Sequence, residues 1–167
     1  MTMNSVKIMA AICLLSGNVF AEEIPIEGNI GSKCVISADT NGVYGNPNAY
    51  TLSTAPADGG VLPIVRFDVS IADSYKAQLT HPSAFSASPT LNDVPTFSGA
   101  TEVSAMGDAA MAGYEAAKVE FGNTTEFDLT EAGSVWFKTT SSITNGGNKA
   151  FPAGTYRAVV TAECIAK

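Results

Sequence analysis

The sequence predicts an all-β protein, a sandwich or a barrel, and three observations support this fold class. Apolar and polar residues alternate with a period of two along much of the chain. The alternating runs are short and are separated by clusters of turn-forming Gly, Asn, Asp and Pro. Only residues 104–118 have the alanine-rich composition of a helix, and their two internal glycines leave a loop as the alternative.

The first 21 residues have the features of a secretory signal peptide. Lys7 precedes the apolar run 8–15, and Val19 and Ala21 are small enough for the −3 and −1 positions of a signal peptidase site. The apolar run is too short to span a bilayer. We expect cleavage after Ala21, and removal of 21 of the 167 residues leaves a mature chain of 146 that begins with Glu22.

The mature chain is expected to form one domain with a negative net charge. Its length suits a single core, and no linker or shift in composition divides it. Loss of Lys7 leaves 8 basic residues against 16 acidic ones, a net charge of −8. This charge repels phosphate backbones and anionic lipid, so we expect no nucleic-acid partner. Since the apolar run 8–15 is too short to span a bilayer, we expect no membrane span either.

Two cysteines remain once Cys13 is removed with the signal peptide. They are Cys34 and Cys164, and an even number of cysteines in an exported chain predicts a disulfide. The bond would close a loop of 130 residues. For a loop of this size the chain-entropy model gives a stabilisation of about 5 kcal/mol.

The clearest predicted strand is residues 63–72, and the C-terminal run 154–164 repeats its pattern. In the first, the apolar face carries Val65, Phe67, Val69 and Ile71, and the polar face carries Arg66, Asp68 and Ser70. In the second, a row of mostly small side chains shares one face: Tyr156, Ala158, Val160, Ala162 and Cys164. Shorter strands are predicted at 49–53, 74–80, 95–104, 116–121, 126–130 and 134–143.

The sequence offers little to a catalytic or metal site. His81 is the single histidine, so a Ser/His/Asp or Cys/His arrangement depends on it, and we interpret it as a loop or strand-end residue. The acidic residues follow no calcium-loop spacing. We expect no enzyme activity, cofactor or metal, although carboxylates from distant segments can still meet in space. Trp136 and Phe137 are adjacent, so on a strand one faces the core and the other faces outward.

The mature N-terminus, "EEIPIEGNI" at 22–30, alternates like a strand. Ile24, Ile26 and Ile30 share one face with Gly28, and the other face is polar. An isolated strand buries nothing, so this segment must pair with the edge of its own sheet or with another molecule. Periodicity alone leaves both possibilities open.

The run "IPIEGNIGSKCVI" resembles the start of chaperone–usher pilins, in which an alternating extension with a glycine leads into a strand that carries the first cysteine. The matching positions are Ile26, Gly28, Ile30, Cys34 and Ile36. The run "FPAGTYRAVV" at 151–160 looks like the turn and last strand of such subunits. Two features differ from many pilins. The first cysteine has only Cys164 as a mature partner, at the far end of the chain, and the end, "ECIAK", has no near-terminal tyrosine, so the resemblance is to a divergent branch of the family.

This resemblance implies an immunoglobulin-like sandwich that lacks its final strand and is completed by the extension of the next subunit. The implied organisation is a signal peptide at 1–21, a donor-strand extension at 22–32 and a pilin-like domain at 33–167. The implied donor residues are Ile24, Ile26, Gly28 and Ile30. The implied acceptor groove has Tyr156, Ala158, Val160 and Ala162 in its floor. It would be flanked by the strand near Cys34 and by the strand 154–164, with the disulfide holding one end at fixed width.

The implied function is that of a structural subunit of a bacterial surface pilus, or fimbria, that polymerises by donor-strand exchange and supports adhesion or biofilm formation. Its partners would be copies of itself or other pilus subunits, a periplasmic chaperone and an outer-membrane usher. Its route would lead through the periplasm to the cell surface. The alternative is a secreted, monomeric β-sandwich module that binds a carbohydrate or protein ligand through its turns or an exposed aromatic such as Trp136.

Overall fold

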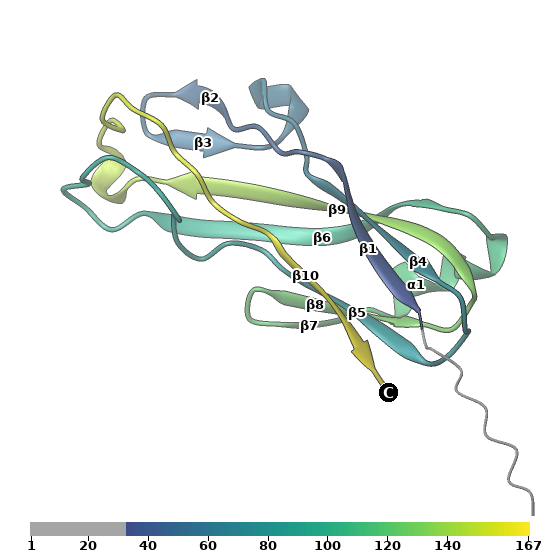
Figure 1. Ribbon diagram of the computed structural model, residues 1–167. Helices are drawn as coiled ribbons and strands as arrows, with labels where there is room; N and C mark the ends of the chain where they lie inside the picture. Colours follow the sequence, from purple (N-terminus) through teal and green to yellow (C-terminus); the bar gives the residue numbers. More distant parts are fainter. Residues whose placement is uncertain (1–32) are drawn as a thin grey trace, which may run out of the picture. The chain divides into compact units, whose positions relative to one another are not determined.

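The computed structural model describes residues 33–167, so the predicted signal peptide and the donor residues Ile24, Ile26, Gly28 and Ile30 lie outside the described part. That part folds as two antiparallel β-sheets with little helix (Figure 1). The predicted all-β class is confirmed, and the two sheets share one core, as in a sandwich.

The first sheet is built around one long strand. Its members are β1 (Cys34–Thr40), β2 (Gly45–Asn48), β3 (Thr51–Ser53), β4 (Ile64–Val69), β6 (Thr96–Met106) and β9 (Gly133–Thr144). β4 pairs with the first half of β9 and β3 with its last residues, whereas β6 pairs along the other edge of β9. β1 continues the sheet beyond β4. It is therefore an edge strand.

The second sheet has four strands, and β10 lies at one of its edges. In sheet order they are β10 (Thr161–Ala166), β5 (Tyr75–Thr80), β8 (Thr124–Leu129) and β7 (Val119–Phe121). The remaining elements are η1 (Pro56–Asp58), η2 (Ala109–Gly113), α1 (Tyr114–Ala117) and η3 (Gly146–Asn148). Within the described chain no helix is long and apolar enough to cross a membrane.

The core follows from the period-two pattern of the interior strands. On β9 every second residue from Val135 to Ile143 is buried, and β5 alternates in the same way. Phe137 of the first sheet lies 4.3 Å from Phe127 of the second, measured between ring centroids, and 5.5 Å from Phe67. These three rings are fully buried and join the two sheets.

Three sequence expectations need correction. The run "GNPN" at 45–48 is one of the clusters of turn-forming residues expected to separate the strands, but it is strand β2, an edge strand, where Pro47 is tolerated because one side has no ladder partner. The candidate helix at 104–118 begins as the end of β6 and continues as η2 and α1. The last strand starts at Thr161 and not at residue 154, because its partner β5 ends at Thr80, just before Pro82.

On the side away from β1 and β10, the edge of β6 is engaged at two main-chain groups by side chains from α1 and from Lys118, which follows it. The Glu115 carboxylate accepts a hydrogen bond from the Val103 N–H at 2.9 Å, and Lys118 donates to the Thr101 carbonyl at 3.3 Å. Lys118 also forms an ion pair with Glu115 at 2.6 Å. This arrangement satisfies main-chain groups that an open edge would present to another chain.

Replacing Glu115 with Ala is expected to lower the free energy of unfolding by about 1 kcal/mol, because the Val103 N–H loses its acceptor. Urea denaturation measures the change. Glu120→Ala is the matched control, since Glu120 also pairs with Lys118, at 3.2 Å, but accepts no main-chain hydrogen bond in residues 33–167. Equal losses in the two variants would mean that the ion pair, and not the covered edge, is what matters.

Candidate functional site

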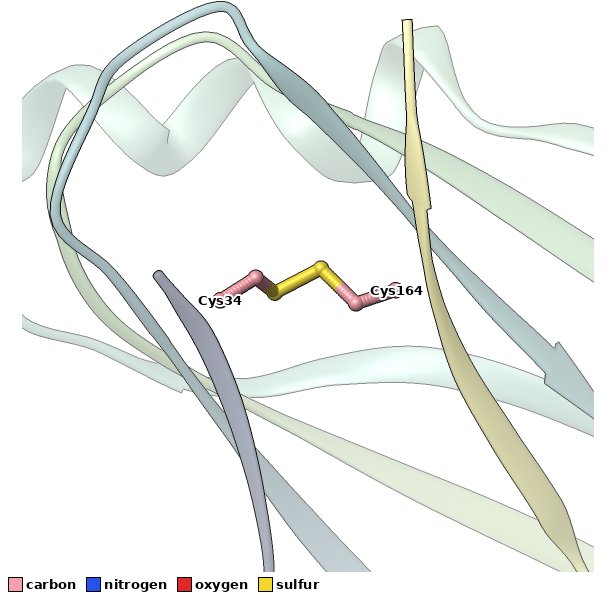
Figure 2. Close-up of a disulfide and its surroundings, with 2 residues drawn as sticks. All are labelled: Cys34 and Cys164. Atoms are coloured by element: carbon pink, nitrogen blue, oxygen red, sulfur yellow. A yellow bond between two sulfur atoms is a disulfide. The ribbon is translucent and has the colours of Figure 1, made fainter. Parts of the chain in front are cut away.

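The edge strands β1 and β10 lie next to each other on one side of the sandwich, and no ladder joins them. In residues 33–167, β1 pairs with β4 alone and β10 with β5 alone (Figure 1). The predicted disulfide is present between them: Cys34 on β1 is bonded to Cys164 on β10, with their Cα atoms 6.3 Å apart (Figure 2). The two sheets are thus covalently joined at this edge.

Beyond the disulfide, two adjoining cavities lie between the chain that follows β1 and the chain that precedes β10. Ala38, Thr40, Val65 and Val160 line the first, of about 440 Å³. Val43, Asn46, Phe151 and Tyr156 line the second, of about 570 Å³. Four residues line both: Gly42, Tyr44, Arg157 and Ala158. The two cavities therefore form one continuous depression, which we call the groove.

Tyr44 lines both cavities, so it lies in the floor of the groove where the two meet, and we call this position the Tyr44 ridge. Its ring is half-buried, and its hydroxyl lies 3.0 Å from the Ser141 hydroxyl, with which it shares a hydrogen bond. Burial raises the pKa of Tyr44 above its ordinary value, and the bond to Ser141 partly opposes the shift. Since Ser141 is itself buried on β9, the tyrosine ring is held in place from below.

The wall of the groove before β10 presents an unpaired main chain. Arg157 exchanges hydrogen bonds with Ala87 and accepts another from the Ser86 N–H. Within residues 33–167 the main-chain groups of 158–160 make no hydrogen bond. Arg157 directs its main-chain groups toward Ala87, and those of its neighbours Tyr156 and Ala158 have no main-chain partner in residues 33–167. An exposed edge of this kind is a template for another strand.

The inward row of the groove is only half covered. Tyr156, Ala158, Val160 and Ala162 are all half-buried, whereas the inward residues of the neighbouring β5 are buried. On the opposite wall, Ile36 is 37% exposed although it lies across from the fully buried Phe67. Apolar side chains at sandwich-core positions therefore remain accessible along both walls.

Of the four residues predicted for the groove floor, the structure brings three to the cavities. Tyr156, Ala158 and Val160 line them, whereas Ala162 lines neither and packs against the core beside the disulfide. The ring of Tyr156 also lies 5.2 Å from those of Phe85 and Phe151, and its hydroxyl donates to the Pro152 carbonyl at 2.6 Å. It forms the outer end of the groove.

Sequence reasoning missed the groove residues that follow β1. The run "TNG" at 40–42 has turn composition and predicts no site residue, yet Gly42 within it and Tyr44 just after it line both cavities. Between them, Val43 forms an isolated antiparallel bridge with Val61. The available signal was the lone aromatic residue between two glycines, but only the bridge to Val61 places that ring in the floor.

The other singled-out residues lie elsewhere. Phe137 is fully buried and Trp136 is half-buried on the opposite face of β9, with the Arg66 guanidinium carbon 5.9 Å from the ring centroid. The Trp136 N–H donates to Asp39 at 3.3 Å, so this ring is already engaged. His81 is half-buried just after β5. In the described residues no three His, Cys, Asp or Glu side chains are grouped to hold a metal ion.

Comparison of the chain with protein-family models, with curated proteins and with solved structures gives no match. The functional argument therefore rests on the groove and on the residue pattern of the N-terminal segment.

Proposed function

We propose that the chain is a structural subunit of a bacterial surface pilus of the chaperone–usher kind and that it polymerises by donor-strand exchange. The observation that carries the proposal is the groove: an unpaired main-chain segment beside a half-covered apolar row. A strand added here gains main-chain hydrogen bonds and buries apolar side chains together. The domain is then an immunoglobulin-like sandwich that lacks its last strand.

The occupant is residues 22–30 of a neighbouring copy. Residues 26–30 of an extended strand cover about 13 Å, the same span as the inward row from Tyr156 to Val160, the part of that row that lines the cavities. The donor's apolar face consists of Ile24, Ile26 and Ile30, which supply the branched side chains that the small residues of the groove leave room for. Shape and length agree.

The gap at Gly28 matches the ridge at Tyr44. Ile26 and Ile30 are separated by about 13 Å along a strand, with Gly28 between them. The groove has two adjoining cavities, and Tyr44 is one of the residues that line both. When the two isoleucines enter the two cavities, the residue without a side chain lies over the ring, where the donor main chain must approach closely.

Charge complementarity favours the same occupant. Arg157 is the charged residue that lines the groove, and it has no ion-pair partner in the described chain. The polar face of the donor carries Glu23 and Glu27. We expect Arg157→Ala to weaken donor binding two- to fivefold, as is typical of an exposed ion pair worth under about 1 kcal/mol.

The control for Arg157 is Arg66→Ala, because Arg66 lies on the outer face of β4 and lines neither cavity. Titration calorimetry at low and at high salt measures both variants. An Arg157 effect that does not diminish with salt would argue against an ionic contact with Glu27.

Export to the cell surface requires that the groove be covered on the way. An open edge with accessible apolar side chains promotes aggregation in the periplasm. A periplasmic chaperone would cover the groove during export. At an outer-membrane usher, the extension of a neighbouring subunit would then replace the chaperone in the groove. Adhesion or biofilm formation is then a property of the assembled fibre.

The test is a thermal melt of the body, residues 32–167, with and without a synthetic peptide of residues 22–31. With the peptide at about 100 times its Kd, a stabilisation of about 2.7 kcal/mol is expected, or roughly 10 °C in Tm. The control peptide carries Gly28→Trp, which places an indole over the Tyr44 ridge, and it should not stabilise. The same Tm with and without the native peptide would contradict the proposal and favour a monomeric binding module.

A further inference from the structure

The disulfide and an inserted strand exclude each other at one level of the groove. A strand that pairs with a neighbour on each side holds those neighbours about 9.5 Å apart, twice the interstrand spacing. The Cα atoms of Cys34 and Cys164 are 6.3 Å apart (Figure 2). Because any disulfide keeps its Cα atoms within about 7 Å, no strand can lie between β1 and β10 where this bond exists.

The surroundings of the bond are closed as well. Cys34, Cys164 and the adjacent Ala162 pack against the core. The Lys167 main-chain N–H donates to the Ser74 carbonyl at 3.1 Å, and its side chain pairs with Asp73 and Asp128. No residue of 33–37 or of 161–167 lines either cavity. The open part of the groove therefore begins beyond the disulfide, at Ala38 on one wall and at Val160 on the other.

We propose that the Cys34–Cys164 disulfide is the end wall of the acceptor groove and sets how far a donor strand enters. This inference rests on the proposed function. The donor then lies in the groove between the chain at 38–46 and the chain at 151–160, its free end stops against 36–37 and 161–162, and it makes no contact with 164–167. The disulfide thereby acts as a positioning element that aligns Gly28 with Tyr44.

The wall also determines which end of the donor faces it. The C-terminal end of the extension continues through 31–33 into the body of its own subunit, so it needs an open exit. Only the free end, created by cleavage after Ala21, can stop against a closed wall. Ile24 therefore lies nearest to the disulfide, and Ile30 lies near Phe151 and Tyr156.

The same geometry favours a second copy as the source of the donor. The extension joins its own body at Lys33, one residue before the disulfide, where the Lys33 carbonyl accepts from the Ser70 N–H at 3.1 Å. To fill its own groove, the extension would have to enter past the closed end and present its row of isoleucines in reverse. A neighbouring copy enters from the open end without this constraint.

Photo-crosslinking of the mature chain tests the proposal. A diazirine analogue of isoleucine replaces Ile24 in one preparation and Ile30 in another, each mixed with isotope-labelled mature chain so that crosslinks between copies are identified by mass. From position 24 we expect crosslinks to 36–38 and 160–162, and from position 30 to 42–46 and 151–156. Crosslinks from either position to 164–167, or the reverse order, would overturn the end wall.

Failure of the proposed function gives a different result, because no crosslink between copies would then form from either position. A variant with Cys34→Ala and Cys164→Ala adds a readout that a purely stabilising disulfide would not change. If this variant folds by near-UV circular dichroism, crosslinks from position 24 should extend to 164–167. An unchanged map in the folded variant would contradict the wall, and if the variant does not fold, the map of the unaltered protein decides alone.

Discussion

Replacing Ala158 with Trp is expected to abolish binding of the 22–31 peptide and assembly of the mature chain. Ala158 lines both cavities and lies on the inward row beside the Tyr44 ridge. An indole at this position occupies the space that Ile26 and Ile30 need. The rise in Tm of roughly 10 °C that the native peptide produces at about 100 times its Kd should disappear. Scanning fluorimetry for the body and light scattering for the mature chain measure the two effects.

The control is Glu163→Trp, on the outward face of β10, which lines neither cavity. It introduces the same side chain in the same C-terminal segment but outside the groove, and it should leave the peptide-induced shift intact. Ala158→Trp should not unfold the body, because the indole covers an apolar row that is already half exposed. A folded Ala158→Trp variant that keeps the full shift would show that the peptide binds elsewhere.

Local periodicity was sufficient for much of the fold. Residues 63–72 alternate clearly, and the structure places Val65, Phe67 and Val69 inward on β4, whereas Ile71 lies beyond the strand. The Cys34–Cys164 bond followed from the count of cysteines in an exported chain. These features depend on the local residue pattern and on the number of cysteines, so they can be predicted from the sequence alone.

The predictions that were wrong concern features that depend on which strands pair with each other in the sheets. "GNPN" has turn composition but is a strand because β3 pairs with it, and residues 154–160 alternate like a strand but have no continuous ladder because β5 ends at Thr80. Tyr44 reaches the groove floor only through the bridge between Val43 and Val61. Pairing across a sheet joins distant residues, and a single sequence contains no direct record of it.

Ala162 shows the same limit within the candidate site. Its place in the alternating row assigned it to the groove with Tyr156, Ala158 and Val160. The disulfide, two residues further on, brings β1 against β10 and closes the sandwich at that level, so Ala162 packs against the core. The sequence predicted that the bond exists but not that it shortens the groove, because that depends on the distance between the two sheet edges.

Removal of the disulfide is expected to have the largest effect on stability. In the variant with Cys34→Ser and Cys164→Ser, the unfolded chain regains the freedom lost in a loop of 130 residues. The chain-entropy model predicts a loss of about 5 kcal/mol, or roughly 15 to 20 °C in Tm for a domain of this size. β1 and β10 share no ladder in the described chain, so no hydrogen bonds between them compensate. Guanidinium denaturation of the variant and the oxidised protein measures the difference.

The reduced, unaltered protein is the control, because it lacks the bond but keeps both cysteine side chains. Both cysteines pack against the core, so serine at these positions adds the cost of half-buried hydroxyls. The reduced protein should therefore lose somewhat less stability than the double variant. A loss below about 1 kcal/mol in the reduced protein would contradict the chain-entropy prediction and would mean that the unfolded chain retains order without the bond.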